Sequence, residues 1–209
     1  QSVYYSIESI KIFESMERLS ETANEYGELG YRLKRRDIKK AFEYMRKGLQ
    51  IAEEINDSVS LCNLYDNYGV LHELNKNNDS AFHFYSRSLN ICEKLSDSVG
   101  MGYSLFNIAN LLVINKQFTE AEKYWKRGLD IRKKLRNEFG LAESYSVIAG
   151  FYLAEGSYDL SIEFFNKALV IFKETDQLYY QILCIEQLSI LSEKKNDLVE
   201  ALHYHKLYS

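Results

Sequence analysis

The sequence predicts an all-α fold, a solenoid of stacked helical units, and three observations lead to this. Small and apolar residues return in register every 40 residues along the chain. Within each unit the apolar residues recur three and four positions apart, the spacing of one helix face. Proline is absent from all 209 residues, which favours long helices with turns made by Asn, Asp, Ser and Gly instead. Self-similarity at a fixed period of this size is typical of repeat solenoids. The clearest columns are Ala41, Ala81, Ala121, Ser161 and Ala201, with Leu49, Leu89, Leu129 and Leu169.

The repeat divides the chain into four full units, each expected to hold two antiparallel helices. The units cover 22–57, 58–97, 98–137 and 138–176, with a half unit at 1–21 and an incomplete unit at 177–209. We therefore expect about eleven helices in a single domain spanning 1–209.

Local sequence supports each part of this division. In the leading half unit, Tyr5 and Ile10 match Tyr44 and Leu49 at a shift of 39 residues, so the chain opens inside a second helix. Turn-forming residues separate the helices within and between units. These turns are Asn56-Asp57-Ser58, Asn77-Asn78-Asp79, Ser96-Asp97-Ser98, Asn115-Lys116-Gln117, Gly156-Ser157, Thr175-Asp176 and Asn196-Asp197. Asn137 is expected to end one unit and cap the next helix.

Composition limits the classes of partner. A formal net charge of −4 gives no general attraction to nucleic acid or to anionic membranes. No apolar run approaches the roughly 18 residues that span a bilayer, and no signal peptide is recognisable. We expect a soluble fragment of a longer protein, cytoplasmic, or periplasmic as part of a bacterial membrane sensor. The cysteines, Cys62, Cys92 and Cys184, are expected to be small apolar residues on helices.

Chemistry-bearing motifs are weak. Glu200-x-x-His203 lacks the second motif that a di-iron bundle needs, so we expect a surface pair, and we expect no metal or cofactor. Gly100-Met101-Gly102 lies in a helical pattern without a preceding strand and is not a phosphate loop. The basic clusters at 34–40 and 123–136 are expected to be solvated helix faces. The sequence therefore does not indicate an enzyme.

Several motifs resemble the tetratricopeptide repeat (TPR). Leu105-x-x-Ile108-Ala109-x-x-Leu112 resembles the first helix of that repeat, and Phe118-x-x-Ala121-x-x-x-Trp125-x-x-Gly128 resembles the second. The 40-residue period and the missing proline are similar to the longer variety found in kinesin light chains, G-protein-regulator scaffolds and bacterial sensors. The segment 200–209 resembles the last helix of TPR sensor regions in bacterial signalling proteins. The resemblance implies a right-handed α-α superhelix.

The resemblance also implies a groove lined by the first helices. Asparagines at the places of Asn67, Asn107 and Asn110 often hold a peptide backbone in this family, although Val147 and Gln187 interrupt the series here. The alternative is that these residues only complete the stack. The candidate groove residues are Asn63, Asp66, Asn67, Tyr103, Phe106, Asn107, Asn110, Val113, Val147 and Gly150.

The function that follows is a protein- or peptide-binding module, the sensory or scaffolding part of a larger bacterial signal-transduction protein. One alternative is a receptor domain for a small signalling peptide in a quorum-sensing regulator; another is an assembly scaffold without a signalling role. The groove around the third unit favours a ligand with an apolar centre and basic flanks. The chain starts with an apolar face, which predicts a homodimer or end-to-end packing of copies. Its residues are Tyr4, Tyr5, Ile7, Ile10 and Phe13.

Overall fold

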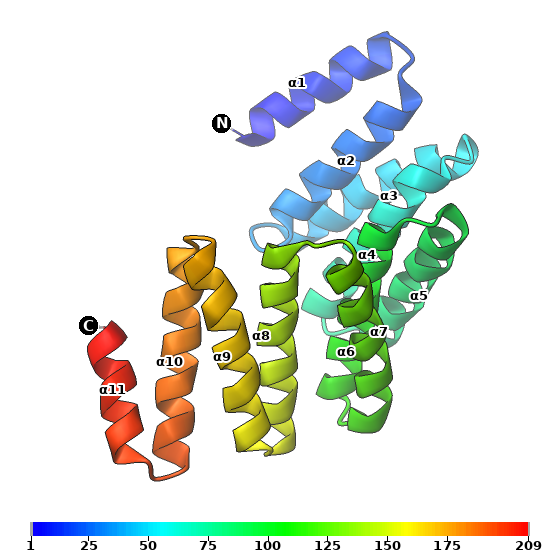
Figure 1. Cartoon of the computed structure of the whole chain (residues 1–209). Helices are drawn as coiled ribbons and strands as arrows, with labels where there is room; N and C mark the ends of the chain where they lie inside the picture. The colour runs from blue at the N-terminus through cyan, green and yellow to red at the C-terminus, as the bar shows by residue number, and fades with distance from the viewer. Residues whose placement is uncertain (1, 209) are drawn as a thin grey trace. The chain divides into compact units, whose positions relative to one another are not determined.

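The structure, a computed structural model, describes residues 2–208, so that Gln1 and Ser209 of the predicted domain lie outside the described residues. The described residues form eleven α-helices and no β-strand, which confirms the all-α prediction (Figure 1). The helices are α1 (Ser2–Ser15), α2 (Leu19–Leu33), α3 (Ile38–Glu54), α4 (Ser58–Leu74), α5 (Asn78–Leu95), α6 (Ser98–Ile114), α7 (Phe118–Lys134), α8 (Glu138–Glu155), α9 (Tyr158–Glu174), α10 (Leu178–Lys194) and α11 (Leu198–Tyr208).

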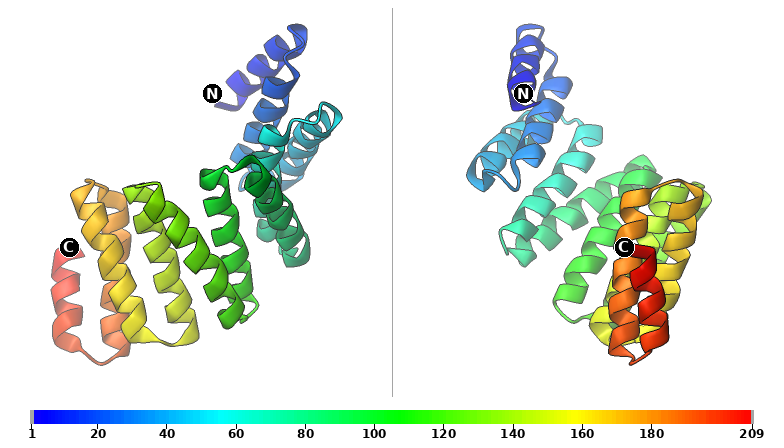
Figure 2. Two further views of the ribbon diagram at one scale, coloured as in Figure 1. Left: turned by 45° about the vertical axis from the view of Figure 1, so that its right-hand side comes forward. Right: turned by 90° about the vertical axis from the view of Figure 1, so that its left-hand side faces the viewer.

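The helices belong to two compact units, 1–111 and 112–209, which meet within α6. In unit 1, α2 packs on α3 and α4 packs on α5. In unit 2, α8 packs on α9 and α10 packs on α11, and these antiparallel pairs are visible in Figure 2. Each pair is one repeat of the predicted period. The single domain expected for 1–209 stays a prediction.

Helix starts follow the predicted caps where a capping side chain is present. Asp57 accepts hydrogen bonds from the N–H groups of Val59 and Ser60, and Asn137 accepts one from Gly140. The helix α2 begins three residues before the predicted boundary at 22, after Arg18, whose side chain makes no capping bond. The boundary was misplaced because no Ser, Thr, Asp or Asn precedes that helix.

Small residues allow close helix contact in unit 1. Ala41 and Ala52 are fully buried, and a Cβ at Gly48 would lie 2.6 Å from the carbonyl oxygen of Ala23. A Cβ at Gly30 would similarly lie 2.8 Å from the carbonyl oxygen of Ala41. The small-residue columns are therefore required by backbone-to-backbone packing between paired helices.

The core of unit 2 is richer in aromatic rings. Trp125 and Phe151 are buried with their ring centroids 6.2 Å apart at a steep angle. Arg132 is buried as well, and its Nη1 donates to the carbonyl oxygen of Gly140 at 2.6 Å and to Ser144 Oγ at 2.9 Å. These bonds join the second helix of one repeat to the first helix of the next within the unit.

The cationic column of the repeat packs along aromatic rings. The Lys47 ammonium lies 5.7 Å from the ring centroids of Tyr26 and Tyr44. The Arg87 guanidinium lies 4.1 Å from the ring centroid of Tyr65. Cations at these distances are attracted by the ring faces, so this column contributes to the architecture of the stack.

Candidate functional site

The candidate site is a cleft of about 720 Å³ in unit 1, which we call the unit 1 cleft. Its walls come mainly from α2, α4 and α6, the first helices of three successive repeats. The lining residues are Asn24, Gly27, Glu28, Tyr31, Cys62, Asn63, Leu64, Asp66, Asn67, Val70, Ser88, Gly100, Tyr103 and Asn107. One lining residue, Ser88, comes from a second helix, α5.

The lining combines polar and apolar groups, and its charged side chains are acidic, with no basic side chain among the described residues. Four asparagines, at positions 24, 63, 67 and 107, provide amide donors and acceptors. Glu28 contributes a carboxylate that lies 3.8 Å from the Arg32 guanidinium on the same helix. Tyr103 is 52% exposed and presents its ring to the cleft, so aromatic contact area accompanies the amides.

A hydrogen-bonded group beside the cleft joins two successive repeats; we call it the Asp66 network. Asn107 Nδ2 donates to Asp66 Oδ2 at 2.9 Å, and Ser104 Oγ lies 3.1 Å from Asp66 Oδ1. Ser104 Oγ is also 3.0 Å from Ser88 Oγ, and Ser88 Oγ donates to the carbonyl oxygen of Cys62 at 2.7 Å. The network thus runs from α6 to α4 directly, and through Ser88 on α5.

Burial raises the pKa of Asp66 to about 6, and the charge of Glu73 adds to the rise. The hydrogen bonds from Ser104 and Asn107 favour the ionised form and act in the opposite direction. The carboxyl therefore changes its charge within the range of pH in which most proteins are studied.

The structure brings five of the predicted site residues together. Asn63, Asp66, Asn67, Tyr103 and Asn107 all line the unit 1 cleft. Whether they bind a ligand stays a prediction.

The remaining predicted residues lie elsewhere. Phe106, expected to offer an apolar floor, is 4% exposed, so its ring presents almost no surface to a ligand. Asn110 and Val113 are half-buried and lie outside the lining of the cleft. Val147 lines a separate cavity of unit 2, and Gly150 is half-buried on the same helix.

Sequence reasoning missed the contribution of α2. Asn24, Gly27, Glu28 and Tyr31 line the cleft, and they match Asn63, Asp66, Asn67 and Val70 at a shift of 39 residues. The same shift related the leading half unit to the first full unit. Extending the groove columns by that shift would have found these four residues.

The cavity of unit 2 has a volume of about 370 Å³ and lies among α8, α9 and α10. It is lined by Glu143, Ser146, Val147, Phe165, Phe172, Tyr180, Leu183, Cys184 and Gln187. Aromatic and aliphatic side chains predominate, and burial raises the pKa of the Glu143 carboxyl. This cavity suits an apolar side chain better than a polar one.

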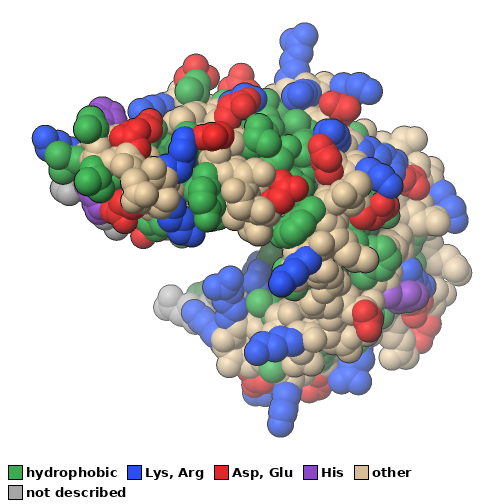
Figure 3. All heavy atoms as spheres, turned by 90° about the horizontal axis from the view of Figure 1, so that it is seen from below, with side chains coloured by type: hydrophobic (Ala, Val, Ile, Leu, Met, Phe, Trp, Pro, Cys, Tyr) green, Lys and Arg blue, Asp and Glu red, His purple; other side chains and the backbone are tan. Residues whose placement is uncertain are grey.

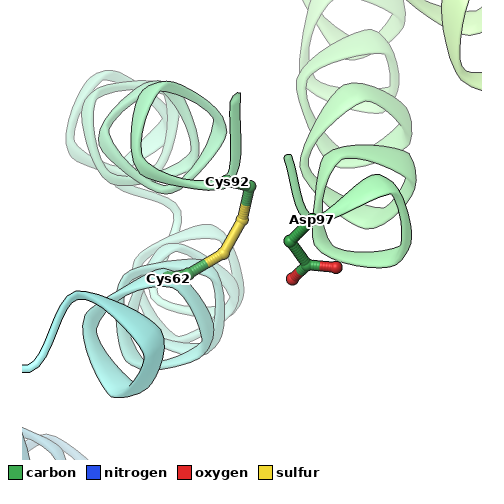
Figure 4. Close-up of side chains that lie close together, drawn as sticks. All are labelled: Cys62, Cys92 and Asp97. Carbon is green, nitrogen blue, oxygen red and sulfur yellow. A yellow bond between two sulfur atoms is a disulfide. The ribbon is translucent and has the colours of Figure 1, made fainter. Parts of the chain in front are cut away.

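The cysteines differ from expectation. Cys184 is buried and forms no disulfide, which agrees with the expected small apolar residue on a helix. Cys62 and Cys92 instead form a disulfide between α4 and α5, with their Cα atoms 5.8 Å apart (Figure 4). The two positions are 30 residues apart on different helices, so their spacing in the sequence gave no sign of the pairing. The expectation that Cys62 and Cys92 are no more than small apolar residues on helices was therefore wrong.

The basic clusters are interspersed with acidic side chains. Lys123 pairs with Glu120 at 2.7 Å, and Lys126 pairs with Glu122 at 2.6 Å, all on α7. The face in Figure 3 likewise shows Lys and Arg mixed with Asp and Glu. This distribution fits solvated helix faces. Among the described residues, no helix combines the length and the apolar character needed to cross a membrane.

Comparison with known proteins agrees with the helical repeat. Models of the tetratricopeptide repeat match residues 59–134 and 142–172, together about half of the chain. No curated protein sequence matches the chain.

Three solved structures illustrate the likeness of fold. BtubC (BKLC) from P. vanneervenii matches with a TM-score of 0.81 and 19% identity, over 99% of this chain and 87% of that chain. A signal transduction ATPase with numerous domains, carrying a tetratricopeptide repeat sensor, from Pyrococcus horikoshii has a TM-score of 0.79 and 20% identity, over 96% and 32%. A Rap protein complexed with competence and sporulation factor has a TM-score of 0.76 and 15% identity, over 99% and 63%. The chain thus spans less than two thirds of the last two proteins, and identities this low show the fold alone.

Proposed function

Because the chain belongs to the tetratricopeptide repeat family, we propose that it is a protein- or peptide-binding module whose ligand lies in the unit 1 cleft. The observation that carries the proposal is the lining of this cleft by the first helices of three successive repeats, rich in asparagine. Side-chain amides offer a donor and an acceptor at once, and a peptide backbone presents the complementary groups at each residue. Neither the lining nor the fold suggests a catalytic role.

The charge of the cleft favours a segment with basic side chains. Glu28 and Asp66 are acidic, and no cation lines the cleft among the described residues. Tyr31 and Tyr103 add aromatic surface, onto which an apolar or cationic side chain packs. The ligand therefore combines a backbone held by amides with basic groups near the carboxylates, and the rim charges mainly set its rate of association.

The wider role that we propose is sensory or scaffolding, within a larger signal-transduction protein. The similar folds of a TPR-sensor ATPase and of a Rap protein complexed with a competence and sporulation factor support this role. A receptor for a small signalling peptide is the second candidate, and the Rap complex favours it specifically. An assembly scaffold without signalling is the third.

A peptide-library selection on the immobilised chain tests the proposal. We expect the recovered peptides to be enriched in Lys or Arg and to lose binding to the Glu28→Gln, Asp66→Asn variant. Recovery of acidic peptides, or binding unaffected in the folded variant, would argue against the unit 1 cleft as the binding site. The exposed Glu54→Gln change, on the outer helix α3, is the matched control.

Self-association is a separate proposal about the surface formed by α1 and the turn that follows it. Tyr4, Tyr5 and Met16 are 64%, 65% and 59% exposed, and such apolar side chains favour contact with another copy. Ile10, expected to be part of that surface, is buried, and Ile7 and Phe13 are half-buried. Light scattering at increasing protein concentration tests this proposal. The average molar mass of the parent should rise, and the molar mass of a Tyr5→Lys, Met16→Lys variant should remain that of the monomer. A parent that stays monomeric throughout would remove the proposal.

A further inference from the structure

The disulfide between Cys62 and Cys92 is specific to the second repeat. Forty residues later the same two places hold Gly102 and Arg132. In the fourth repeat they hold Ala142 and Phe172. The packing of a repeat therefore does not need cysteine at either place, and the pair calls for a different explanation.

The pair lies against the unit 1 cleft. Cys62 and Gly100 both line it. A Cβ at Gly100 would lie 2.6 Å from Cys92 Sγ, 3.0 Å from Cys62 Sγ and 2.5 Å from Asp97 Oδ2, so the Asp97 carboxylate lies beside the sulfur atoms and position 100 adds no side chain over them. Asp97 Oδ1 accepts from the N–H groups of Val99 and Gly100, which caps α6. Cys62 is 2% exposed and Cys92 is fully buried, so a small thiol reaches the disulfide through local opening of the cleft wall beside Gly100.

The sulfur atoms are next to the Asp66 network. Cys62 Sγ lies 3.8 Å and Cys92 Sγ lies 3.9 Å from Ser88 Oγ. Ser104 Oγ carries one proton, but it lies within hydrogen-bond distance of two acceptors, Asp66 Oδ1 and Ser88 Oγ. Ser88 Oγ has two lone pairs, and a second donor to this oxygen makes it a weaker acceptor for Ser104.

We propose that Cys62 and Cys92 are a reversible thiol–disulfide site whose state selects the arrangement of the Asp66 network at the unit 1 cleft. When the disulfide is formed, neither sulfur carries a proton, and Ser104 Oγ lies within hydrogen-bond distance of both Asp66 Oδ1 and Ser88 Oγ. When the pair is reduced, a thiol S–H donates to Ser88 Oγ, which then accepts less strongly from Ser104, and the Ser104 proton shifts toward Asp66 Oδ1.

The redox step balances with an ordinary thiol partner. Oxidation forms the S–S bond as the two thiols lose two electrons and two protons. A small disulfide such as oxidised glutathione accepts them and leaves as two thiols, through attack of a protein thiolate on one of its sulfur atoms. Reduction is the reverse reaction. The proposal does not depend on the identity of any ligand of the cleft, and its test uses none.

Nuclear magnetic resonance of the whole chain tests the proposal. All samples carry Cys184→Ser, which leaves only the pair to react; Ser104 and Ser144 occupy the same place in two other repeats, so serine fits there. The side-chain amide signals of Asn107 are identified by their loss in Asn107→Ala. We expect them to move when reduced glutathione replaces the oxidised form, while those of Asn137 in unit 2 stay in place.

A second variant separates the network from a general effect of the disulfide. Ser88→Ala removes the hydroxyl between the sulfur atoms and Ser104, and Ala168 shows that alanine fits this place in the repeat. Ser88→Gly, matching Gly48 and Gly128, serves if the alanine variant is unfolded. In either variant, thiol titration should still follow reduction of the pair, but the Asn107 signals should no longer respond.

Three results would overturn the proposal. The first is an Asn107 signal that is the same in both redox states of the Cys184→Ser protein. The second is a response that persists without the Ser88 hydroxyl. The third is binding of one zinc ion per chain by the reduced protein that leaves both thiols unreactive toward a thiol reagent, because Cys62, Cys92 and Asp97 would then be metal ligands.

Discussion

Asn107 donates its side-chain amide to the carboxylate of Asp66 across 2.9 Å, from the first helix of one repeat to the first helix of the preceding one. Both residues line the unit 1 cleft. The bond links the packing of successive repeats to the surface that we propose binds a ligand. The Asp66 carboxyl is half-buried, so its charge should affect the stability of the fold.

Asp66→Asn should stabilise the fold at neutral pH and have little effect in acid. The native carboxyl has a pKa of about 6, which is above the pKa of the unfolded chain. At a pH between these two pKa values, the native carboxyl is protonated and the unfolded carboxyl is ionised. The parent therefore loses stability as pH rises through that window, by about 1–3 kcal/mol, and the amide does not. Urea unfolding of both proteins from pH 4 to pH 8 measures the difference. A difference independent of pH would show that Asp66 titrates normally.

Reduction of the Cys62–Cys92 disulfide should lower the stability of unit 1. A cross-link that closes a loop of this length restricts the unfolded chain and stabilises the fold by about 2–4 kcal/mol. Thermal unfolding with and without a reductant measures the loss. The Cys62→Ala, Cys92→Ala variant is the control, because its melting temperature should not respond to the reductant. An equal response of the parent and this variant would contradict the disulfide.

Phe106→Ala should lower the stability of the fold, whereas Tyr103→Ala should weaken ligand binding. Phe106 is buried, so its truncation should cost about 3–5 kcal/mol of stability. Tyr103 is about half exposed in the cleft, so its truncation should change stability by roughly 0.5 kcal/mol or less. Only Tyr103→Ala should weaken a cleft ligand while the fold is preserved. Chemical unfolding and peptide binding on the same two variants check both statements.

Lys116→Gly should stabilise the turn between α6 and α7. Lys116 has a φ of 60°, in the left-handed region that costs a non-glycine residue roughly 1–2 kcal/mol, whereas the equivalent Gly156 has a φ of 92°. We expect a gain of about 0.5–1 kcal/mol, since the added freedom of the unfolded glycine offsets part of the relief. Gly156→Lys should lose a similar amount. Stability changes of the same sign in the two exchanges would refute this account of the turns.

The repeat pattern predicted the helices well because burial repeats with the period. The same columns placed Asn63, Asn67 and Asn107 on first helices, where they line the cleft. The turns were located by Asn56 and Asn196, both of which have positive φ, but Lys76 and Lys116 adopt the same conformation without a characteristic residue type. At these turns the backbone conformation depends on the position within the repeat and not on the type of side chain.

The rest of the site depends on contacts that periodicity does not describe. Phe106 occupies the place of Asp66 one repeat later, yet Phe106 is buried and Asp66 lines the cleft, because the neighbours of each place differ between repeats. The pairing of Cys62 with Cys92 likewise depends on how α4 and α5 pack. The repeat period predicts the position of a side chain on its helix, but it does not predict which residues contact that side chain.

The most direct measurement of the central claim is calorimetric titration of a library-selected basic peptide into the parent and into the Asn67→Ala, Asn107→Ala variant. If the cleft amides hold the peptide, the variant should bind about tenfold or more weakly, as loss of central interface contacts does, while circular dichroism shows it folded. Asn90→Ala, an exposed asparagine on the outer helix α5, should bind like the parent. Equal affinity of the folded double variant and the parent would contradict the claim that the unit 1 cleft is the binding site.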